Sequence, residues 1–149
     1  MREKTLIILK PDCLEKHIVN KVIERLLKVG QIINMDFCLV NSEKITQHYS
    51  DNLKKWPMDI TYRVINYFVN KNVIILVLEG EDICRKVREI IGDSDPANAC
   101  EDTIRGDFSE DSYELALAEK RSCYNIIHAS DNYEQFKKEY TIWFGDEKL

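Results

Sequence analysis

The segment Thr5-Leu-Ile-Ile-Leu-Lys-Pro-Asp12 joins a short apolar run to a charged end. The run from Thr5 to Leu9 shows no alternation of polar and apolar residues, which is typical of a strand buried on both faces near the centre of a sheet. Because Lys10 follows the run directly, the sequence predicts a cationic side chain at the carboxyl end of a central strand. Such an end is a natural position for a ligand contact.

Apolar residues recur every three to four positions in two segments, as they do on one face of a helix. The first segment begins at Ile18 and has Gly30 as its expected C-cap. The second covers residues 83–91, with Arg88 at the flank of its apolar face and Gly92 just beyond its end. We therefore expect Arg88 to reach out of the core.

The remaining segments predict three more strands and several shorter helices. The strands are expected over Gln31–Val40, Val73–Leu78 and Tyr124–Ala129. One short helix is expected to start at an N-cap on Ser42, another to cover residues 60–68, and a third to start at a capping box formed by Asp131 and Glu134. Residues 52–60 and 93–108 are expected to be loops, and residues 109–122 to be polar and partly helical.

This order of elements favours a ferredoxin-like α+β sandwich, in which helices cover one face of a four-stranded, mainly antiparallel sheet. The chain has 149 residues, which is enough for one sizeable core and too few for two ordinary domains. We therefore expect a single domain over residues 1–149.

The charge balance limits the classes of ligand. The formal net charge is −5 and the sequence pI is about 5.3, whereas general binding to nucleic acid or to an anionic membrane needs a surplus of basic surface residues. We expect neither kind of partner. A polyanionic ligand would have to meet a local cluster of cations.

The cysteines and the N-terminus indicate the compartment. The five cysteines are scattered and form no C-x-x-C pair, so we expect reduced structural thiols. The N-terminal apolar run is too short for a signal sequence or for a membrane span, which needs about 20 residues. These features predict a cytoplasmic protein.

No stock catalytic motif is present. The sequence contains no G-x-x-x-x-G-K-[ST], no G-x-G-x-x-G, no G-x-S-x-G and no pair of histidines at metal-ligand spacing. Taken alone, His128 in its apolar strand reads as a satisfied core residue, and Glu139 and Arg88 read as helix-surface residues. Arg105 reads alone as a loop residue that bonds its neighbour Asp107. His17 and His48 read as surface or packing residues.

Four segments taken together change this interpretation. They are Thr5-Leu-Ile-Ile-Leu-Lys-Pro-Asp12, His48-Tyr49, Thr103-Ile-Arg-Gly-Asp-Phe108 and Asn125-Ile-Ile-His-Ala-Ser-Asp131. In this combination and order the chain resembles the nucleoside diphosphate kinases from about Arg2 to Phe144. The resemblance implies a phosphotransferase that passes the γ-phosphate of a nucleoside triphosphate to a nucleoside diphosphate by a ping-pong route.

The resemblance also implies roles for individual residues. His128 matches the catalytic histidine, which becomes phosphorylated; Glu139 matches the acid that bonds its other ring nitrogen, and Ser130 the hydroxyl that supports this acid. The residues that match contacts to the nucleotide are Lys10, Tyr49, Arg88, Ser94, Arg105 and Asn125, with Ser94 standing where the family has threonine. Mg²⁺ is expected to arrive on the phosphates of the nucleotide, without a protein cage of its own.

Three departures from the family pattern stand out. Ala129 replaces a glycine beside the nucleophile, which requires a negative φ at this position. The stretch between Tyr49 and Tyr67 is about three residues longer than usual, so that Ile60 aligns with the residue that stacks on the base, with Tyr62 and Trp56 as aromatic candidates. The stretch from Ser109 to Tyr124 is roughly ten residues longer, and we expect this insertion to shape the rim near the base and ribose.

Two alternatives to an active kinase stay open at this level. One is a catalytically weak nucleotide-binding or regulatory homologue, which complete retention of Lys10, Arg88, Arg105, Asn125 and His128 disfavours. The other is a ferredoxin-like RNA-binding domain, which the acidic balance disfavours. The resemblance further implies a homo-oligomer, namely a hexamer, tetramer or dimer.

Overall fold

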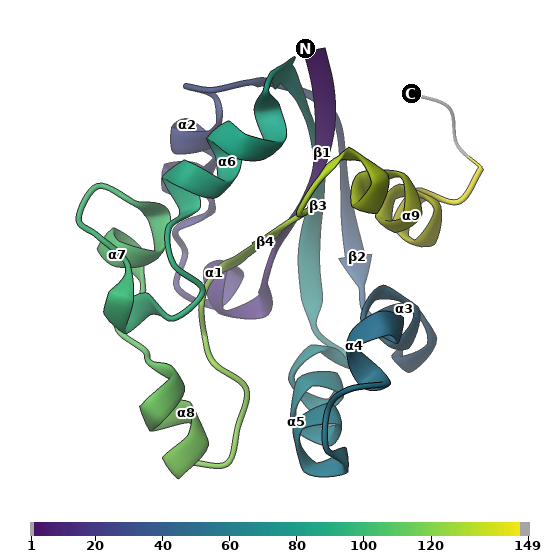
Figure 1. Ribbon diagram of the computed structural model, residues 1–149, viewed down its shortest axis with the longest axis vertical. Helices are drawn as coiled ribbons and strands as arrows, with labels where there is room; N and C mark the ends of the chain where they lie inside the picture. Colours follow the sequence, from purple (N-terminus) through teal and green to yellow (C-terminus); the bar gives the residue numbers. More distant parts are fainter. Residues whose placement is uncertain (1, 147–149) are drawn as a thin grey trace.

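The fold is built on a four-stranded antiparallel sheet, seen in a computed structural model that describes residues 2–146 (Figure 1). The strands are β1 (Arg2–Leu9), β2 (Gln31–Leu39), β3 (Asn72–Glu81) and β4 (Ile127–Ala129), and their order in the sheet is β2-β3-β1-β4. In the register, Ile8 of β1 lies opposite Ile75 of β3 on one side and His128 of β4 on the other. The predicted ferredoxin-like α+β class and the position of the apolar run inside the sheet are both confirmed.

Nine helices and one 3₁₀ turn are present within residues 2–146. Their bounds are α1 (Pro11–Glu15), α2 (Val19–Leu26), α3 (Ser42–His48), α4 (Ser50–Leu53), α5 (Met58–Phe68), α6 (Ile83–Ile91), the 3₁₀ turn η1 (Pro96–Asn98), α7 (Ile104–Phe108), α8 (Tyr113–Ala118) and α9 (Tyr133–Phe144). None of these helices has the length and apolar character needed to cross a bilayer.

Helices cover both faces of the sheet, so the expectation of cover on one face is wrong. Alternate side chains of β1 point to opposite sides: Ile7 and Leu9 join a core with α2 and α6, whereas Leu6 and Ile8 join a second core with α3, α5 and α9. Figure 1 shows α2 and α6 on one side of the sheet and α9 on the other. Because both faces are buried, β1 has apolar residues at successive positions rather than at every second one.

Three expected helix ends are also wrong. Asn41, rather than Ser42, caps α3 by accepting a hydrogen bond from the backbone of Lys44 at 2.8 Å. In the same way Asn132, rather than Asp131, caps α9. Gly30 is not the C-cap of α2, because that helix ends at Leu26.

The expected loops contain more helix than their sequences indicate. Residues 52–60 include the end of α4 and the start of α5, and residues 93–108 include η1 and α7. Thr103 caps α7 by accepting from the backbone of Gly106 at 3.0 Å. The insertion holds α8, in agreement with the predicted partly helical segment. These short helices bring polar residues to the carboxyl end of β1, where the candidate site lies.

Candidate active site

His128 lies on β4, whose start is set by a tight turn. The backbone N–H of Ile127 donates to the carbonyl of Asn125 at 2.8 Å, and the residue between them, Ile126, has a φ of 74°. This γ-turn is strained for a β-branched residue, and its neighbours hold it in place. The N–H of Ile126 donates to Asp12 Oδ2 at 3.0 Å, and its carbonyl accepts from Lys10 N at 2.8 Å. The turn replaces the first residues of the strand expected from Tyr124, and it fixes the position of His128 beside β1.

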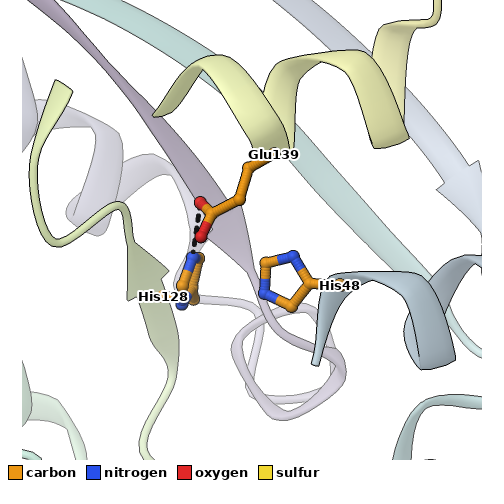
Figure 2. Close-up of side chains that lie close together, drawn as sticks. All are labelled: His48, His128 and Glu139. Carbon is orange, nitrogen blue, oxygen red and sulfur yellow. Dashed lines mark hydrogen bonds and ion pairs between the residues drawn. The ribbon is translucent and has the colours of Figure 1, made fainter. Parts of the chain in front are cut away.

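A buried carboxylate orients the His128 ring. Nε2 of His128 lies 2.9 Å from Glu139 Oε1, and the Ser130 hydroxyl donates to the same oxygen at 2.8 Å. Gln135 Nε2 donates to the other carboxylate oxygen at 3.1 Å. Figure 2 shows Glu139 reaching from α9 to one ring nitrogen, while the other nitrogen points away from it. Since no residue within 2–146 forms a hydrogen bond with Nδ1 of His128, that nitrogen is left available for chemistry.

The carboxylate stays ionised at neutral pH. Burial of Glu139 favours its neutral form, but the hydrogen bond and the charge of His128 outweigh this effect and lower its pKa to about 2. The ionised Glu139 accepts a hydrogen bond from the N–H at Nε2, and in the tautomer with this single proton the lone pair of the ring is on Nδ1. The geometry therefore makes Nδ1 the nucleophilic nitrogen.

His48 packs against His128. Its sequence signal is limited to the His48-Tyr49 pair, which predicts no role for His48 in the site. The two rings meet edge to face with centroids 4.6 Å apart, and Trp143 Nε1 donates to His48 Nδ1 at 3.0 Å. Burial, with the nearby His128, lowers the pKa of His48 to about 3, so this ring is neutral. His48, His128 and Glu139 are also the one group of metal-type ligands within residues 2–146, with ligand atoms within 4.8 Å of one another. Trp143 donates a hydrogen bond to His48, and Ser130 donates one to Glu139. These bonds are those expected of residues that hold the His128 ring in position.

Lys10 and Asn125 form a pair at the carboxyl end of β1. The ammonium of Lys10 donates to Asn125 Oδ1 at 2.6 Å, and Asn125 Nδ2 donates to the carbonyl of Ser94 at 2.9 Å. Burial, assisted by the charge of Arg105, lowers the pKa of Lys10 to about 8. Three predicted nucleotide residues are thus held in one network.

Arg105 is buried and bound to the backbone around His128. Its guanidinium donates to the carbonyls of Asn125, Ile127 and Gly92 at 3.0, 2.6 and 3.3 Å. The alternative partner Asp107 instead pairs with Arg25 at 2.6 Å, so a purely local role for Arg105 is wrong. Burial lowers the pKa of Arg105, as expected for a cation without a carboxylate partner.

Arg88 reaches from α6 to the carboxyl end of β4. It donates to the carbonyl of Ala129 at 3.2 Å and pairs with Asp131 at 2.9 Å, with 44% of its side chain exposed. Ala129 has a negative φ, which satisfies the condition that its extra methyl group imposes. Arg88 is therefore a partly exposed cation that binds the chain just after His128.

A cavity of about 430 Å³ opens beside these groups, which is large enough for a small ligand. Lys10 and Asn125 line it, and so do the predicted residues Tyr49 and Ile60. The helix α8 of the insertion supplies part of the wall, and Trp56 lies in the wall near Tyr49, their ring centroids being 5.4 Å apart. Figure 1 shows α8 and α5 at the same end of the molecule. The other residues of the wall, for which the sequence predicts no role, are Arg63, Val64, Phe68, Tyr113, Ala116, Leu117, Arg121, Ser122 and Cys123.

The aromatic candidate Tyr62 does not belong to this cavity. It lines a second cavity of about 340 Å³, which shares Arg63, Arg121 and Ser122 with the first. Its side chain is 71% exposed. Tyr62 therefore lies outside the cavity that Trp56 and Ile60 line.

Comparisons with known proteins point to one family. The family model of nucleoside diphosphate kinase matches residues 3–149. A nucleoside diphosphate kinase of Methanocaldococcus jannaschii is 33% identical over 150 residues, covering 100% of this chain and 98% of the relative. A structure of the Borrelia burgdorferi nucleoside-diphosphate kinase, a transition state mimic with bound vanadate and ADP, has a TM-score of 0.91 at 32% identity, covering 97% and 88% of the two chains. An NDP kinase from Pyrobaculum aerophilum has a TM-score of 0.89 at 28% identity, covering 100% and 99%.

Proposed function

The chain belongs to the nucleoside diphosphate kinase family, a family of phosphotransferases, and we propose that His128 carries the phosphoryl group between nucleotides in a single domain over residues 1–149. The observation that carries this proposal is the state of the His128 ring. Nε2 is bound to a buried carboxylate, Nδ1 has no hydrogen-bond partner within residues 2–146, and Lys10 and Arg105 are bonded to the segment that leads into His128. This arrangement suits a nucleophile that must accept and release a phosphoryl group.

In the first half-reaction, Nδ1 of His128 attacks the γ-phosphorus of a nucleoside triphosphate. A P–N bond forms while the bond between the γ-phosphorus and the β–γ bridging oxygen breaks, and the nucleoside diphosphate leaves with that electron pair. Glu139 stabilises the positive charge that the phosphorylated ring acquires, because it stays anionic in contact with Nε2. The second half-reaction is the reverse, with another nucleoside diphosphate as acceptor.

The cations around His128 match the charge of the group in transit. Phosphoryl transfer depends mainly on positioning and on donors aimed at phosphate oxygens. Lys10, Arg88 and Arg105 are the proposed cationic donors, and Tyr49, Ser94 and Asn125 are the proposed neutral contacts. Arg105 is already fixed by three carbonyls, so it needs little reorganisation when the ligand binds.

Mg²⁺ is proposed to accompany the nucleotide. The metal-type cluster of His48, His128 and Glu139 offers two ring nitrogens, whereas Mg²⁺ prefers oxygen ligands in octahedral geometry. The residues present therefore fit an ion that is held by phosphate oxygens. Bound there, Mg²⁺ would neutralise part of the phosphate charge.

The cavity between α5 and α8 is the proposed place of the nucleoside. Lys10 and Asn125 lie at its phosphate end, and Ile60, Trp56 and Leu117 offer apolar surface for a base. The lengthened loop then contributes directly to the wall around base and ribose. Its ends are fixed by a bidentate pair between Arg121 and Asp111, at 2.7 and 2.9 Å, which keeps α8 in position.

The edge strand β2 supports assembly of several copies. Its outer side chains Met35, Phe37 and Leu39 are 54%, 67% and 62% exposed. An exposed apolar edge strand is a template for pairing with another chain. We propose that two copies pair along β2 in a homo-oligomer. All five cysteines are unpaired, which fits the proposed cytoplasmic location.

The deciding experiment is phosphorylation of the protein by γ-labelled ATP. We expect one label per chain, labile in acid and stable in alkali, which is transferred to added GDP. His128→Ala should abolish the label and lower turnover by at least ~10⁴-fold. His17→Asn is the matched control, because His17 is exposed and lies far from β4 in the sequence. Label that persists in His128→Ala overturns the assignment, and nucleotide binding without any label favours a homologue that lacks turnover.

A further inference from the structure

Arg63 has a buried hydrogen-bond donor that nothing in the described part of the chain satisfies. It lies on α5, and its side chain is 15% exposed. Nη2 is 3.4 Å from Asp59 Oδ2, but Nη1 is buried and has no hydrogen-bond partner within residues 2–146. A buried N–H without an acceptor is costly, and because Nη1 is sealed from solvent, the cost is relieved when the side chain turns toward a ligand that supplies an acceptor.

Arg63 faces the proposed nucleoside cavity. Ile60, Arg63 and Val64 are spaced by three and four residues, so they share one face of α5, and all three line the cavity. The other arginine of the cavity wall, Arg121, is already engaged. It binds Asp111 with both terminal nitrogens and stacks over Tyr124 at 4.2 Å from the ring centroid. Of these two arginines, Arg63 is the one that has a side-chain donor without a partner within residues 2–146.

The position of Arg63 separates it from the phosphates. Lys10 and Asn125, which bond each other near β4, mark the phosphate end of the cavity. Arg63 lies at another side of the cavity, where Arg63, Arg121 and Ser122 separate it from the second cavity and line both. A nucleotide whose phosphates lie at Lys10 extends its base away from them, along the wall formed by α5 and α8.

We propose that Arg63 reads the edge of the base and gives the enzyme a preference for guanine nucleotides over adenine nucleotides. This inference rests on the proposed binding of the nucleotide in this cavity. A guanidinium only donates hydrogen bonds, and guanine presents two adjacent acceptors, O6 and N7. Adenine has an amino group in place of O6 and would set a donor against a donor. Asp59 contacts Nη2 at 3.4 Å, which leaves Nη1 and the second N–H of Nη2 to form the fork for the base edge.

The test compares diphosphates that differ only in the base edge. Calorimetric titration should give about tenfold tighter binding for GDP than for ADP, which is the scale of one bidentate contact. IDP, which keeps O6 and N7, should bind like GDP, and 2-aminopurine riboside diphosphate, which lacks O6, should bind like ADP. In Arg63→Met the GDP preference should fall below about twofold, while ADP binding changes little.

Two further variants complete the design. Arg63→Lys keeps one charge and loses the fork, so we expect it to retain only part of the preference. Arg85→Met removes the same charge at an exposed site on α6, where Arg85 pairs with Glu89 at 2.8 Å, and should leave the preference unchanged. Circular dichroism and the Tm of each variant show whether it folds.

The outcomes separate this inference from the proposed function. Equal binding of GDP and ADP by the wild type, or an unchanged ratio in a folded Arg63→Met, refutes the role of Arg63 even when His128 is labelled normally. A loss of tripolyphosphate binding in Arg63→Met that equals the loss of GDP binding also refutes it, because Arg63 would then contact phosphate. A wild type that binds GDP selectively but is never labelled at His128 refutes the proposed catalytic route and leaves base recognition standing.

Discussion

Binding of a nucleotide should draw protons onto Lys10. The ammonium of Lys10 is held at 2.6 Å from Asn125 Oδ1, and burial together with Arg105 lowers its pKa to about 8. In the free protein the residue therefore loses its proton at a pH where exposed lysines keep theirs. A phosphate oxygen beside the ammonium favours the charged form and raises the pKa again.

The size of the effect follows from this pKa. A group with a pKa of about 8 is about half protonated at pH 8 and about nine-tenths protonated at pH 7. If the bound form is fully protonated, binding takes up about 0.5 proton at pH 8 and about 0.1 at pH 7. Above pH 8 the affinity should weaken, because an increasing share of the binding energy is needed to protonate Lys10.

The assay is calorimetric titration with ADP in buffers of different ionisation enthalpy, from pH 7 to 8.5. Lys10→Arg is the matched control, since arginine keeps its charge over this range and any titration of the nucleotide itself is common to both proteins. The difference in proton uptake between wild type and control should rise from about 0.1 to about 0.8 across the range. No difference at pH 8, or an affinity of the wild type that is independent of pH, would refute the reasoning.

Four further perturbations separate the roles of the site and its surroundings. Glu139→Gln should lower kcat by about 10²-fold with little change in nucleotide Kd, because it removes the charge that orients and stabilises the His128 ring; an equal rise in Kd would contradict this role. Arg105→Ala should lower kcat by roughly 10²-fold and also lower the free energy of unfolding in urea by about 2 kcal/mol, since three carbonyls lose a donor. Phe37→Asp should reduce the assembly measured by analytical ultracentrifugation, and an unchanged mass would exclude β2 as the interface. Replacing residues 111–120 by a short glycine-containing turn should change nucleotide KM or base preference while His128 is still phosphorylated; loss of the label in a folded variant would mean that the loop takes part in the chemistry.

Sequence patterns predicted the elements whose apolar residues follow a regular helical period or form an unbroken run. The helix at residues 83–91 was placed correctly because its apolar residues follow the helical period, and β1 was recognised by its unbroken apolar run. An unbroken apolar run implies that both faces of the sheet are covered, and the expectation of helices on one face disagreed with this. The caps at Asn41 and Asn132 were misplaced because good capping residues stand side by side at both positions, and local sequence does not choose between them.

The site was predictable in part for a different reason. The motifs identified Lys10, Arg105 and His128 without revealing how they meet, and their contacts depend on the γ-turn at Ile126, which no local propensity favours. His48 and Arg63 carry no signal of their own in the sequence. Their positions follow from helices that pack only when the whole chain folds, so the tertiary structure was needed to find them.

The two ends of the cavity are built on different principles, and this difference bears on how the enzyme can vary. At the proposed phosphate end, Lys10 binds the side chain of Asn125, and Arg105 binds the carbonyls of Asn125 and Ile127. A change in one of these residues therefore disturbs the backbone that leads to His128. At the base end, α5 and α8 present apolar side chains and the unsatisfied donor of Arg63, with few hydrogen bonds between the two walls. Under the proposed binding mode, we expect substitutions there to alter which base fits and to leave the nucleophile in place. The insertion that forms α8 adds wall at this end, and its hydrogen bonds to Asp95 and to the backbone of Tyr124 join it to the segments beside Ser94 and Asn125.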